Sequence, residues 1–227
     1  METELKLRFI QDGDRSSFFS DPWIADLLLP DSRQQLDMHS QYYDTAAGAL
    51  TIRRASLRIR REDDRRIATV KLGKAANNGL HQRLEWSVNL DDDAMDWSDQ
   101  PEKGLNASWF LKLAVSDGDP DDRLRELLLE IDGQPLLEIC QAEFTRIAYD
   151  IGYGDTLMEL ALDIGELRAG PLTAQINELE LELKEGDVRD LMALGDEMQA
   201  RYDVEPESQS KYARCLALLR QIQENEA

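Results

Sequence analysis

The chain has 227 residues, of which 42% are hydrophobic, and a formal net charge of −20 at pH 7. This length and apolar content predict a globular protein with a buried core, built as one large domain or two small ones. The excess of acidic residues excludes general nucleic-acid binding, because that activity needs a basic surface to displace counterions from phosphates. Any cationic site is therefore expected to be local and enclosed.

The N-terminal segment alternates strictly between charged and uncharged residues, which is the period of a β-strand over residues 2–10. Leu5 and Leu7 share one face of this strand. The opposite face carries Glu2, Glu4, Lys6 and Arg8. Two carboxylates followed by two cations suggest a site for a metal and a polyanion. For Arg8 alone, a surface ion pair is the favoured interpretation.

Periodicity and turn residues predict the other elements in chain order. The predicted helices cover residues 17–29, 45–54, 107–115, 122–130, 187–201 and, starting at Ser208 or Ser210, the last segment through residue 223. The predicted strands cover residues 36–44, 56–61, 66–73, 81–90, 136–153, 156–164 and 173–185. The links between the strands are short, which favours antiparallel pairing.

Charged faces like that of the first strand recur in residues 57–60 and 178–184. For any one strand, an exposed face is an equal alternative. Recurrence favours a charged interior filled by ligand and cations, because like charges at neighbouring positions repel and would destabilise three strands facing water. We therefore predict an α+β fold dominated by a closed antiparallel sheet, with helices on its apolar outside and charged faces lining the lumen.

The cysteine content and the absence of long apolar runs indicate where in the cell the protein resides. Cys140 and Cys215 are too few and too distant in sequence to predict a metal knuckle or a disulfide framework, so we expect reduced thiols. No run approaches the ~18 apolar residues of a membrane span, and the N-terminus has no apolar signal segment. We expect a soluble cytoplasmic protein with no membrane partner.

Several short motifs occur in a set order along almost the whole chain. They are Glu2-x-Glu4-x-Lys6, Tyr42-Tyr-Asp44 with Leu57-Arg-Ile-Arg60, Val70-Lys71, Gly79-Leu-His-Gln-Arg83 with Glu85, Asp163, Glu180-Leu-Glu182 and Ser210-Lys211. In this order they resemble those of CYTH-domain proteins, the triphosphate tunnel metalloenzymes, and are most similar to those of bacterial inorganic triphosphatases.

The resemblance implies a closed eight-stranded antiparallel β-barrel that forms a tunnel, with helices packed outside. Residues 1–227 would form a single CYTH domain, without the C-terminal helical CHAD domain that many of those relatives carry. A divalent metal would be bound by carboxylates, and a triphosphate by lysines and arginines.

Candidate metal ligands are acidic residues, because Mg²⁺ and Mn²⁺ prefer carboxylate oxygens and retained waters. They are Glu2, Glu4, Asp163, Glu180 and Glu182. Glu178 is either a further ligand or a continuation of the charged face. His39 and His81 are expected to be structural.

Candidate substrate-binding residues are cations, since guanidinium forks and ammonium groups match phosphate oxygens. They are Lys6, Arg58, Arg60, Lys71, Arg83, Arg146 and Lys211. Arg146 and Lys211 are included because they match substrate-contacting positions in the relatives; the role of Arg214 stays open. Lys6, Glu85 and Lys211 are the candidate catalytic residues, with Glu85 as an orienting acceptor.

The resemblance implies metal-dependent hydrolysis of inorganic triphosphate (tripolyphosphate) to pyrophosphate and phosphate. The charged residues are suited to catalyse it by positioning and electrostatic stabilisation. The alternatives are a class IV-type adenylate cyclase, a thiamine triphosphatase in which Trp86, Trp97 or Trp109 stacks on the substrate ring, and a non-catalytic polyphosphate-binding module. The expected cofactor is Mg²⁺ or Mn²⁺, the expected partner is a small triphosphate, and the protein is expected to be a monomer or homodimer.

Overall fold

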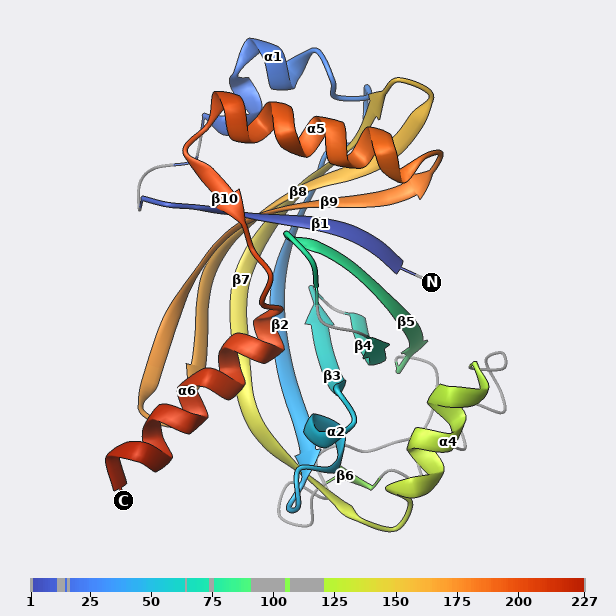
Figure 1. The fold of residues 1–227 in the computed structure, drawn as a ribbon, viewed down its shortest axis with the longest axis vertical. Coiled ribbons are helices and arrows are strands. Elements are labelled where there is room, and N and C mark those ends of the chain that lie inside the picture. Colours follow the sequence, from blue (N-terminus) through green and yellow to red (C-terminus); the bar gives the residue numbers. More distant parts are fainter. Residues whose placement is uncertain are drawn as a thin grey trace.

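The computed structural model describes residues 2–11, 15, 17–63, 65–73, 76–90, 105–106 and 121–226. Eight of the described strands pair side by side in a closed antiparallel barrel (Figure 1). In barrel order they are β1 (Glu2–Phe9), β5 (Leu80–Asn89), β4 (Arg65–Gly73), β3 (Ala55–Glu62), β2 (Gln34–Thr45), β7 (Pro135–Tyr153), β8 (Thr156–Ala169) and β9 (Leu172–Glu185). The predicted α+β barrel is confirmed.

Strand β1 closes the barrel because both of its edges are paired. One edge pairs with β5 over Glu2–Leu5 and then with the short strand β10 (Val204–Pro206). The other edge pairs with β9, where Glu4 lies opposite Glu182 and Lys6 lies opposite Glu180. The first and last long strands of the chain are therefore neighbours.

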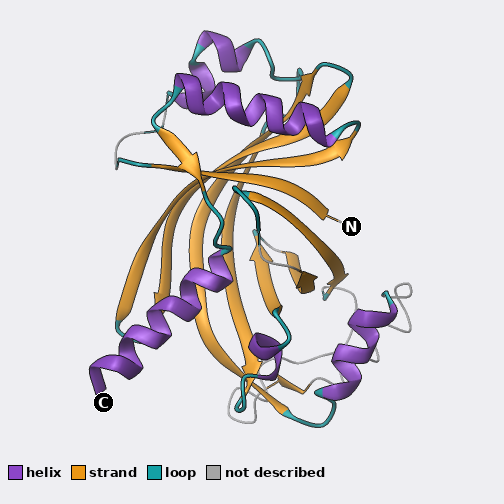
Figure 2. Ribbon diagram, viewed as in Figure 1, coloured by secondary structure: helices purple, strands orange, loops and turns teal. Residues whose placement is uncertain are grey.

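Most of the helices lie outside the sheet, as Figure 2 shows. They are the 3₁₀ turn η1 (Phe18–Ser20) and the helices α1 (Pro22–Ala25), α2 (Ala49–Ile52), α4 (Asp122–Glu130), α5 (Val188–Arg201) and α6 (Lys211–Glu226). A two-residue strand, β6 (Leu105–Asn106), pairs with β7. Among the described residues, no helix is both long and apolar enough to span a membrane.

Helices α4 and α5 each cover an apolar patch on the outer face of the barrel, whereas α6 packs against apolar residues on the inner face of β7, β8 and β9. The patch under α5 includes Leu5, Leu7, Leu179, Leu181 and Leu194. The patch with α4 includes Leu57, Val70, Trp86, Leu124 and Leu128, and the patch with α6 includes Ala142, Leu167, Ile176, Tyr212 and Leu218. Because strand side chains alternate, burying the apolar residues under α4 and α5 outside turns the charged residues between them toward the lumen.

The predicted helix over residues 17–29 is wrong. Asp21 caps the short helix α1 by accepting a hydrogen bond from the Trp23 N–H at 2.9 Å. The chain then leaves the helix, because Leu28 bridges to Ile151 and the Leu29 N–H donates to the Asp150 carbonyl. Backbone pairing with β7 therefore replaces the last helical turns.

Other predicted boundaries also shift. Within residues 45–54, only Ala49–Ile52 is helical. Strand β8 continues past the expected break at Gly165 to Ala169; a Cβ at Gly165 would lie 2.1 Å from the Glu143 carbonyl oxygen, so this glycine permits close strand contact. The predicted helix over residues 107–115 lies outside the described residues.

Cys140 on β7 and Cys215 on α6 form a disulfide, with their Cα atoms 6.1 Å apart. The expectation of two unpaired, reduced thiols is therefore wrong for this structure. The cysteines are 75 residues apart in sequence, and docking of α6 against β7 brings them together. Such a contact leaves no local sequence signal.

Candidate active site

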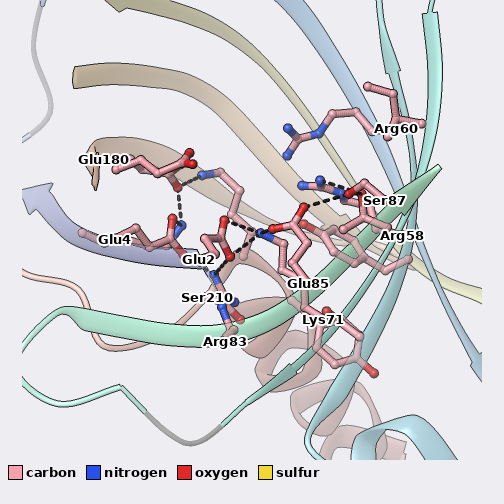
Figure 3. Close-up of a pocket in the computed structure, with 18 of the residues that line it drawn as sticks. Glu2, Glu4, Arg58, Arg60, Lys71, Arg83, Glu85, Ser87, Glu180 and Ser210 are labelled. Atoms are coloured by element: carbon pink, nitrogen blue, oxygen red, sulfur yellow. Dashed lines mark hydrogen bonds and ion pairs between the residues drawn. The ribbon is translucent and has the colours of Figure 1, made fainter. Parts of the chain in front are cut away.

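The inner faces of the strands surround a charged cavity of about 270 Å³ (Figure 3). Of the predicted site residues, Glu2, Glu4, Lys6, Arg58, Arg60, Lys71, Arg83, Glu85, Arg146, Glu180, Glu182 and Lys211 line it. Asp163 is fully buried and is not among the lining residues. The structure thus brings nearly all the predicted residues together from strands far apart in sequence and from the start of α6.

The acidic wall of the cavity consists of Glu2 and Glu4 on β1 and Glu180 and Glu182 on β9. Lys6 lies at the centre of this wall. Its Nζ contacts Glu180 Oε1 and lies 3.1 Å from Glu4 Oε2. Burial lowers the pKa of Lys6, but the charges of Glu180 and Glu4 outweigh burial and raise it overall. Burial likewise raises the pKa of Glu4, and Lys6 and Arg83 outweigh it and bring the value to about 2. Both groups are therefore charged near neutral pH.

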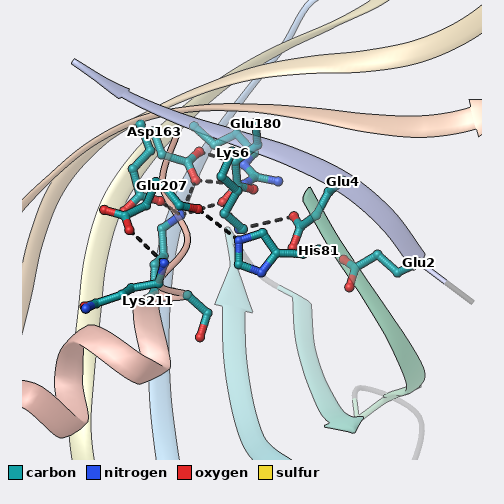
Figure 4. Close-up of polar contacts among 12 residues, drawn as sticks. Glu2, Glu4, Lys6, His81, Asp163, Glu180, Glu207 and Lys211 are labelled. Carbon is teal, nitrogen blue, oxygen red and sulfur yellow. Dashed lines mark hydrogen bonds and ion pairs between the residues drawn. The ribbon is translucent and has the colours of Figure 1, made fainter. Parts of the chain in front are cut away.

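Lys211 enters the cavity from the start of α6. Its Nζ donates hydrogen bonds at 2.8 Å to Asp163, Glu178 and Glu180 (Figure 4). Burial opposes the charge of Lys211, yet these carboxylates raise its pKa well above the ordinary value. Arg214, one turn later on α6, pairs with Glu178. Glu178 thus holds α6 against β9 through two cations and is not among the cavity-lining residues.

Lys71 connects two acidic groups on neighbouring strands. Its Nζ lies 2.6 Å from Glu2 Oε1 and 2.9 Å from Glu85 Oε2. Burial raises the pKa of Glu85, but Lys71 and a hydrogen bond from Ser87 contribute to a net lowering to about 2. Burial raises the pKa of Glu2 overall, despite the attraction of Lys71.

Arg58 and Arg60 form a more strongly cationic wall, on the side of the cavity opposite Glu4 and Glu180 in Figure 3. Arg60 is buried; its Nε donates to Ser40 Oγ at 3.0 Å, and its Nη1 lies 3.3 Å from Glu62. Burial and the charges of Arg58 and Arg146 lower the pKa of Arg60 to about 10. Within the described part of the chain, Arg58 Nε is buried without a hydrogen-bond partner. This wall is suited to an incoming anion.

The acidic wall offers ligands of the type that Mg²⁺ and Mn²⁺ prefer, since its donors are carboxylate oxygens. Glu4 and Glu182 are direct neighbours across β1 and β9, and Glu2 lies two residues before Glu4 on the same face of β1. Each is now paired with a cation, and no three acidic, histidine or cysteine side chains of the described residues converge as a ready ligand set. The carboxylate donors fit a hard divalent ion, provided that they release their present cationic partners and bind the ion instead.

His81 has the structural role expected of it. Its Nε2 lies 3.0 Å from the Glu207 carbonyl oxygen, so the ring links β5 to the segment before α6. Burial and the charge of Lys6 lower the pKa of His81 to about 4, which keeps the ring neutral. Arg8, as expected, forms an exposed ion pair with Glu205.

Several uncharged lining residues are not among the predicted site residues, although Tyr42 and Ser210 belong to the ordered motifs; they are Tyr42, Ser56, Thr69, Ser87, Ser210 and Tyr212. Tyr42 and Tyr212 pack together with ring centroids 5.6 Å apart, closing the cavity beside α6. The one sequence signal for Thr69 and Ser87 is the alternation of side chains along β4 and β5, which places both residues on the inward face. Trp86 belongs to the outer core and does not line the cavity, whereas Trp97 and Trp109 lie outside the described residues.

Comparison with known proteins gives relatives in sequence and in fold. The inorganic triphosphatase of Haemophilus influenzae is 28% identical over 183 residues, which cover 80% of this chain and 46% of the relative. The chain therefore spans about half the length of this curated relative.

Among solved structures, a candidate adenylyl cyclase from Hippeastrum, described as having a dominant triphosphatase activity, has a TM-score of 0.60 at 21% identity over 96% of both chains. A candidate adenylate cyclase from Bacillus halodurans has a TM-score of 0.51 at 16% identity, over 94% of this chain and 98% of that one. These likenesses show a shared fold. A family model for the CYTH domain matches residues 1–216, and the chain belongs to this family.

Proposed function

We propose that the cavity binds inorganic triphosphate and hydrolyses it to pyrophosphate and phosphate with the help of a divalent metal ion. The observation that carries this proposal is the pairing of two unlike walls in one cavity of about 270 Å³. Arg58 and Arg60 face the acidic wall of Glu2, Glu4 and Glu180. A polyanion accompanied by a hard cation is the ligand that satisfies both walls.

The existing ion pairs suggest the order in which the cations engage phosphate. Lys6 and Arg83 both contact Glu4, so a phosphate must compete with this carboxylate for them. Arg58 makes no ion pair with any described residue, and the contact of Arg60 with Glu62 is 3.3 Å long. We infer that Arg58 and Arg60 bind phosphate first.

The other proposed substrate contacts are the remaining lining cations: Lys6, Lys71, Arg83, Arg146 and Lys211. Lys6 and Lys211 would act as catalytic groups by stabilising negative charge on the reacting phosphoryl oxygens, and Glu85 by orienting Lys71. Because these charges are fixed in a largely buried site, they would stabilise the transition state with little reorganisation.

Glu2, Glu4, Glu180 and Glu182 would hold the metal. Bound there, Mg²⁺ or Mn²⁺ would neutralise phosphate charge. Both carboxylate oxygens of Asp163 already accept hydrogen bonds from Arg146, and one of them also from Lys211. We therefore assign Asp163 a supporting role behind Glu180.

The relatives support this choice among triphosphate substrates. The curated relative is an inorganic triphosphatase, and the Hippeastrum protein is described as having a dominant triphosphatase activity. Adenylate cyclase activity is the second candidate, because the structural relatives include candidate cyclases. Tyr42 and Tyr212, with little exposed surface, close the cavity beside α6 and favour the smaller inorganic substrate. We also propose a cytoplasmic location.

The proposal is tested by measuring phosphate release from tripolyphosphate, ATP and thiamine triphosphate, with Mg²⁺, with Mn²⁺ and with a chelator. We expect rapid, metal-dependent release from tripolyphosphate and its loss in Glu4→Gln. Glu205→Gln is the matched control, because Glu205 pairs with Arg8 on the exposed side of the barrel. Tight binding of tripolyphosphate without release would identify a binding module, and pyrophosphate formed from ATP would identify a cyclase.

A further inference from the structure

A row of hydrogen-bonding side chains crosses three strands on the cationic side of the cavity. Arg58 on β3 is the register neighbour of Thr69 on β4, and Thr69 is the register neighbour of Ser87 on β5. Arg58 Nη2 lies 3.3 Å from Thr69 Oγ1, and Thr69 Oγ1 lies 3.0 Å from Ser87 Oγ. Ser87 Oγ lies 2.8 Å from Glu85 Oε1, so the row ends at a carboxylate.

The chemistry of the two ends sets the direction of every hydrogen bond in this row. A guanidinium can only donate, and an ionised carboxylate can only accept. Arg58 must therefore donate to Thr69, Thr69 must donate to Ser87, and Ser87 must donate to Glu85. Hydrogen bonds aligned in one direction polarise and strengthen one another. The row thus couples the negatively charged Glu85 to Arg58 electrostatically, without a direct ion pair between them.

The row leaves the phosphate-binding atoms of Arg58 available. No carboxylate of the described residues forms an ion pair with Arg58, and its Nε is buried without a partner. Arg60, by contrast, is held from the opposite side by Ser40 and Glu62. Thr69 is 1% exposed and cannot turn to water instead, so its hydroxyl fixes one edge of the Arg58 guanidinium.

We propose that Thr69 and Ser87 are positioning residues, which link Glu85 to Arg58 and hold the Arg58 guanidinium ready for a phosphate group of the substrate. This inference rests on the proposed function, because it assigns the role of Arg58 in triphosphate binding. It adds two uncharged residues to the binding machinery, neither of which contacts substrate for this role.

The first test measures tripolyphosphate binding by calorimetry in the presence of a chelator, so that turnover does not interfere. Thr69→Val and Ser87→Ala should each raise the Kd, by about tenfold for Thr69→Val, the size expected for one lost hydrogen bond to a charged group. Thr69→Ser keeps the hydroxyl and should restore affinity. Thr173→Val is the matched control, because Thr173 is an exposed strand residue that does not line the cavity.

A double-mutant comparison separates this role from a general effect on the barrel. In an Arg58→Gln background, Thr69→Val should cause no further loss of affinity, because the group that it positions is already absent. Equal losses with and without Arg58, or an unchanged Kd in Thr69→Val, would overturn the proposal. Ser87 is exposed to the cavity, so Ser87→Ala keeps the test available if Thr69→Val folds poorly.

The second test does not depend on the substrate. In ligand-free protein with ¹⁵N-labelled arginine, the Arg58 Nε–H signal should show restricted motion in wild type and in Thr173→Val. It should show increased motion in Thr69→Val and Ser87→Ala. Unchanged motion in both variants would contradict the positioning role. If wild type neither binds nor hydrolyses tripolyphosphate, the proposed function fails, and this second test still decides whether the row holds Arg58.

Discussion

Arg146 and Asp163 meet across the β7–β8 pair as a two-point ion pair, with Nε–Oδ1 and Nη2–Oδ2 distances of 2.7 Å. Asp163 is fully buried and also accepts a hydrogen bond from Lys211. Burial raises the pKa of Asp163, but Arg146 and Lys211 outweigh burial and lower it overall. One buried carboxylate therefore fixes two of the cations that line the cavity.

Asp163→Asn should destabilise the fold more than it changes metal affinity. Removing one partner of a buried ion pair leaves uncompensated charge, which costs about 3–5 kcal/mol. Urea unfolding should show this loss, while Mn²⁺ binding followed by electron paramagnetic resonance should be nearly unchanged. A large loss of Mn²⁺ affinity with normal stability would instead make Asp163 a direct ligand.

Arg60→Lys should weaken tripolyphosphate binding, because lysine cannot reproduce the planar fork that engages two phosphate oxygens. We expect a rise in Kd of about tenfold, the size of one lost charged hydrogen bond. Arg61→Lys is the matched control, since Arg61 is the next residue and is exposed. Equal affinities of the two variants would remove Arg60 from the substrate-binding set.

Acidification should destabilise the protein through His81, whose pKa is lowered from 6.5 to about 4 by burial and by Lys6. Below pH 6.5 the unfolded chain binds a proton at this ring that the folded protein does not, so stability falls as pH falls toward 4. Glu4 affects stability only at lower pH. Because its pKa is lowered from 4.5 to about 2, the stability that it contributes is lost only as pH falls below 4.5.

His81→Gln should remove the His81 part of this loss, since glutamine can still donate to the Glu207 carbonyl. Between about pH 7 and about pH 5, wild type should lose on the order of 2 kcal/mol more than the variant. Urea unfolding at both pH values measures the difference, with His39→Gln as the control. Identical losses in wild type and His81→Gln would show that this ring is not buried as a neutral group.

Breaking the Cys140–Cys215 disulfide should lower stability. The bond joins residues 75 apart, and closing a loop of that size stabilises a fold by up to about 4 kcal/mol through the unfolded state. Urea unfolding with and without reductant should show this loss in wild type. The Cys215→Ala variant has no disulfide, so reductant should not change its stability. Thiol titration of unreduced, denatured protein should find no free thiol; two free thiols would show that the pair is reduced, as in a reducing cytoplasm.

The charged interior could be predicted from sequence because a strand has a period of two. Once Leu5 and Leu7 lie outside, Glu4 and Lys6 must lie inside. The pairing of Asp163 could not be predicted in this way, since it depends on the register between β7 and β8. The ordered motifs predicted Asp163 as a candidate metal ligand without revealing that its oxygens already accept hydrogen bonds from Arg146 and Lys211.

Uncharged site residues and docking contacts were beyond sequence reasoning for a different reason. Thr69 and Ser87 resemble any polar strand residues until the register places them between Arg58 and Glu85. The segment before Pro30 has apolar residues at helical spacing, but Leu28 pairs with Ile151 through the backbone, and the helix does not continue there. Both outcomes depend on partners more than 100 residues away or on neighbouring strands, which local patterns do not encode.

The double pairing of β1 has a consequence for how the protein is made. Strand β1 gains its pairing with β9 only after residues 178–182 have been synthesised, long after its own residues. Contacts across such sequence separations form slowly, because chain closure is paid for before the contact stabilises anything. Until then Glu4 and Lys6 remain hydrated and apart from Glu182 and Glu180. In a nascent or partly folded chain, the charged cavity is therefore not yet assembled.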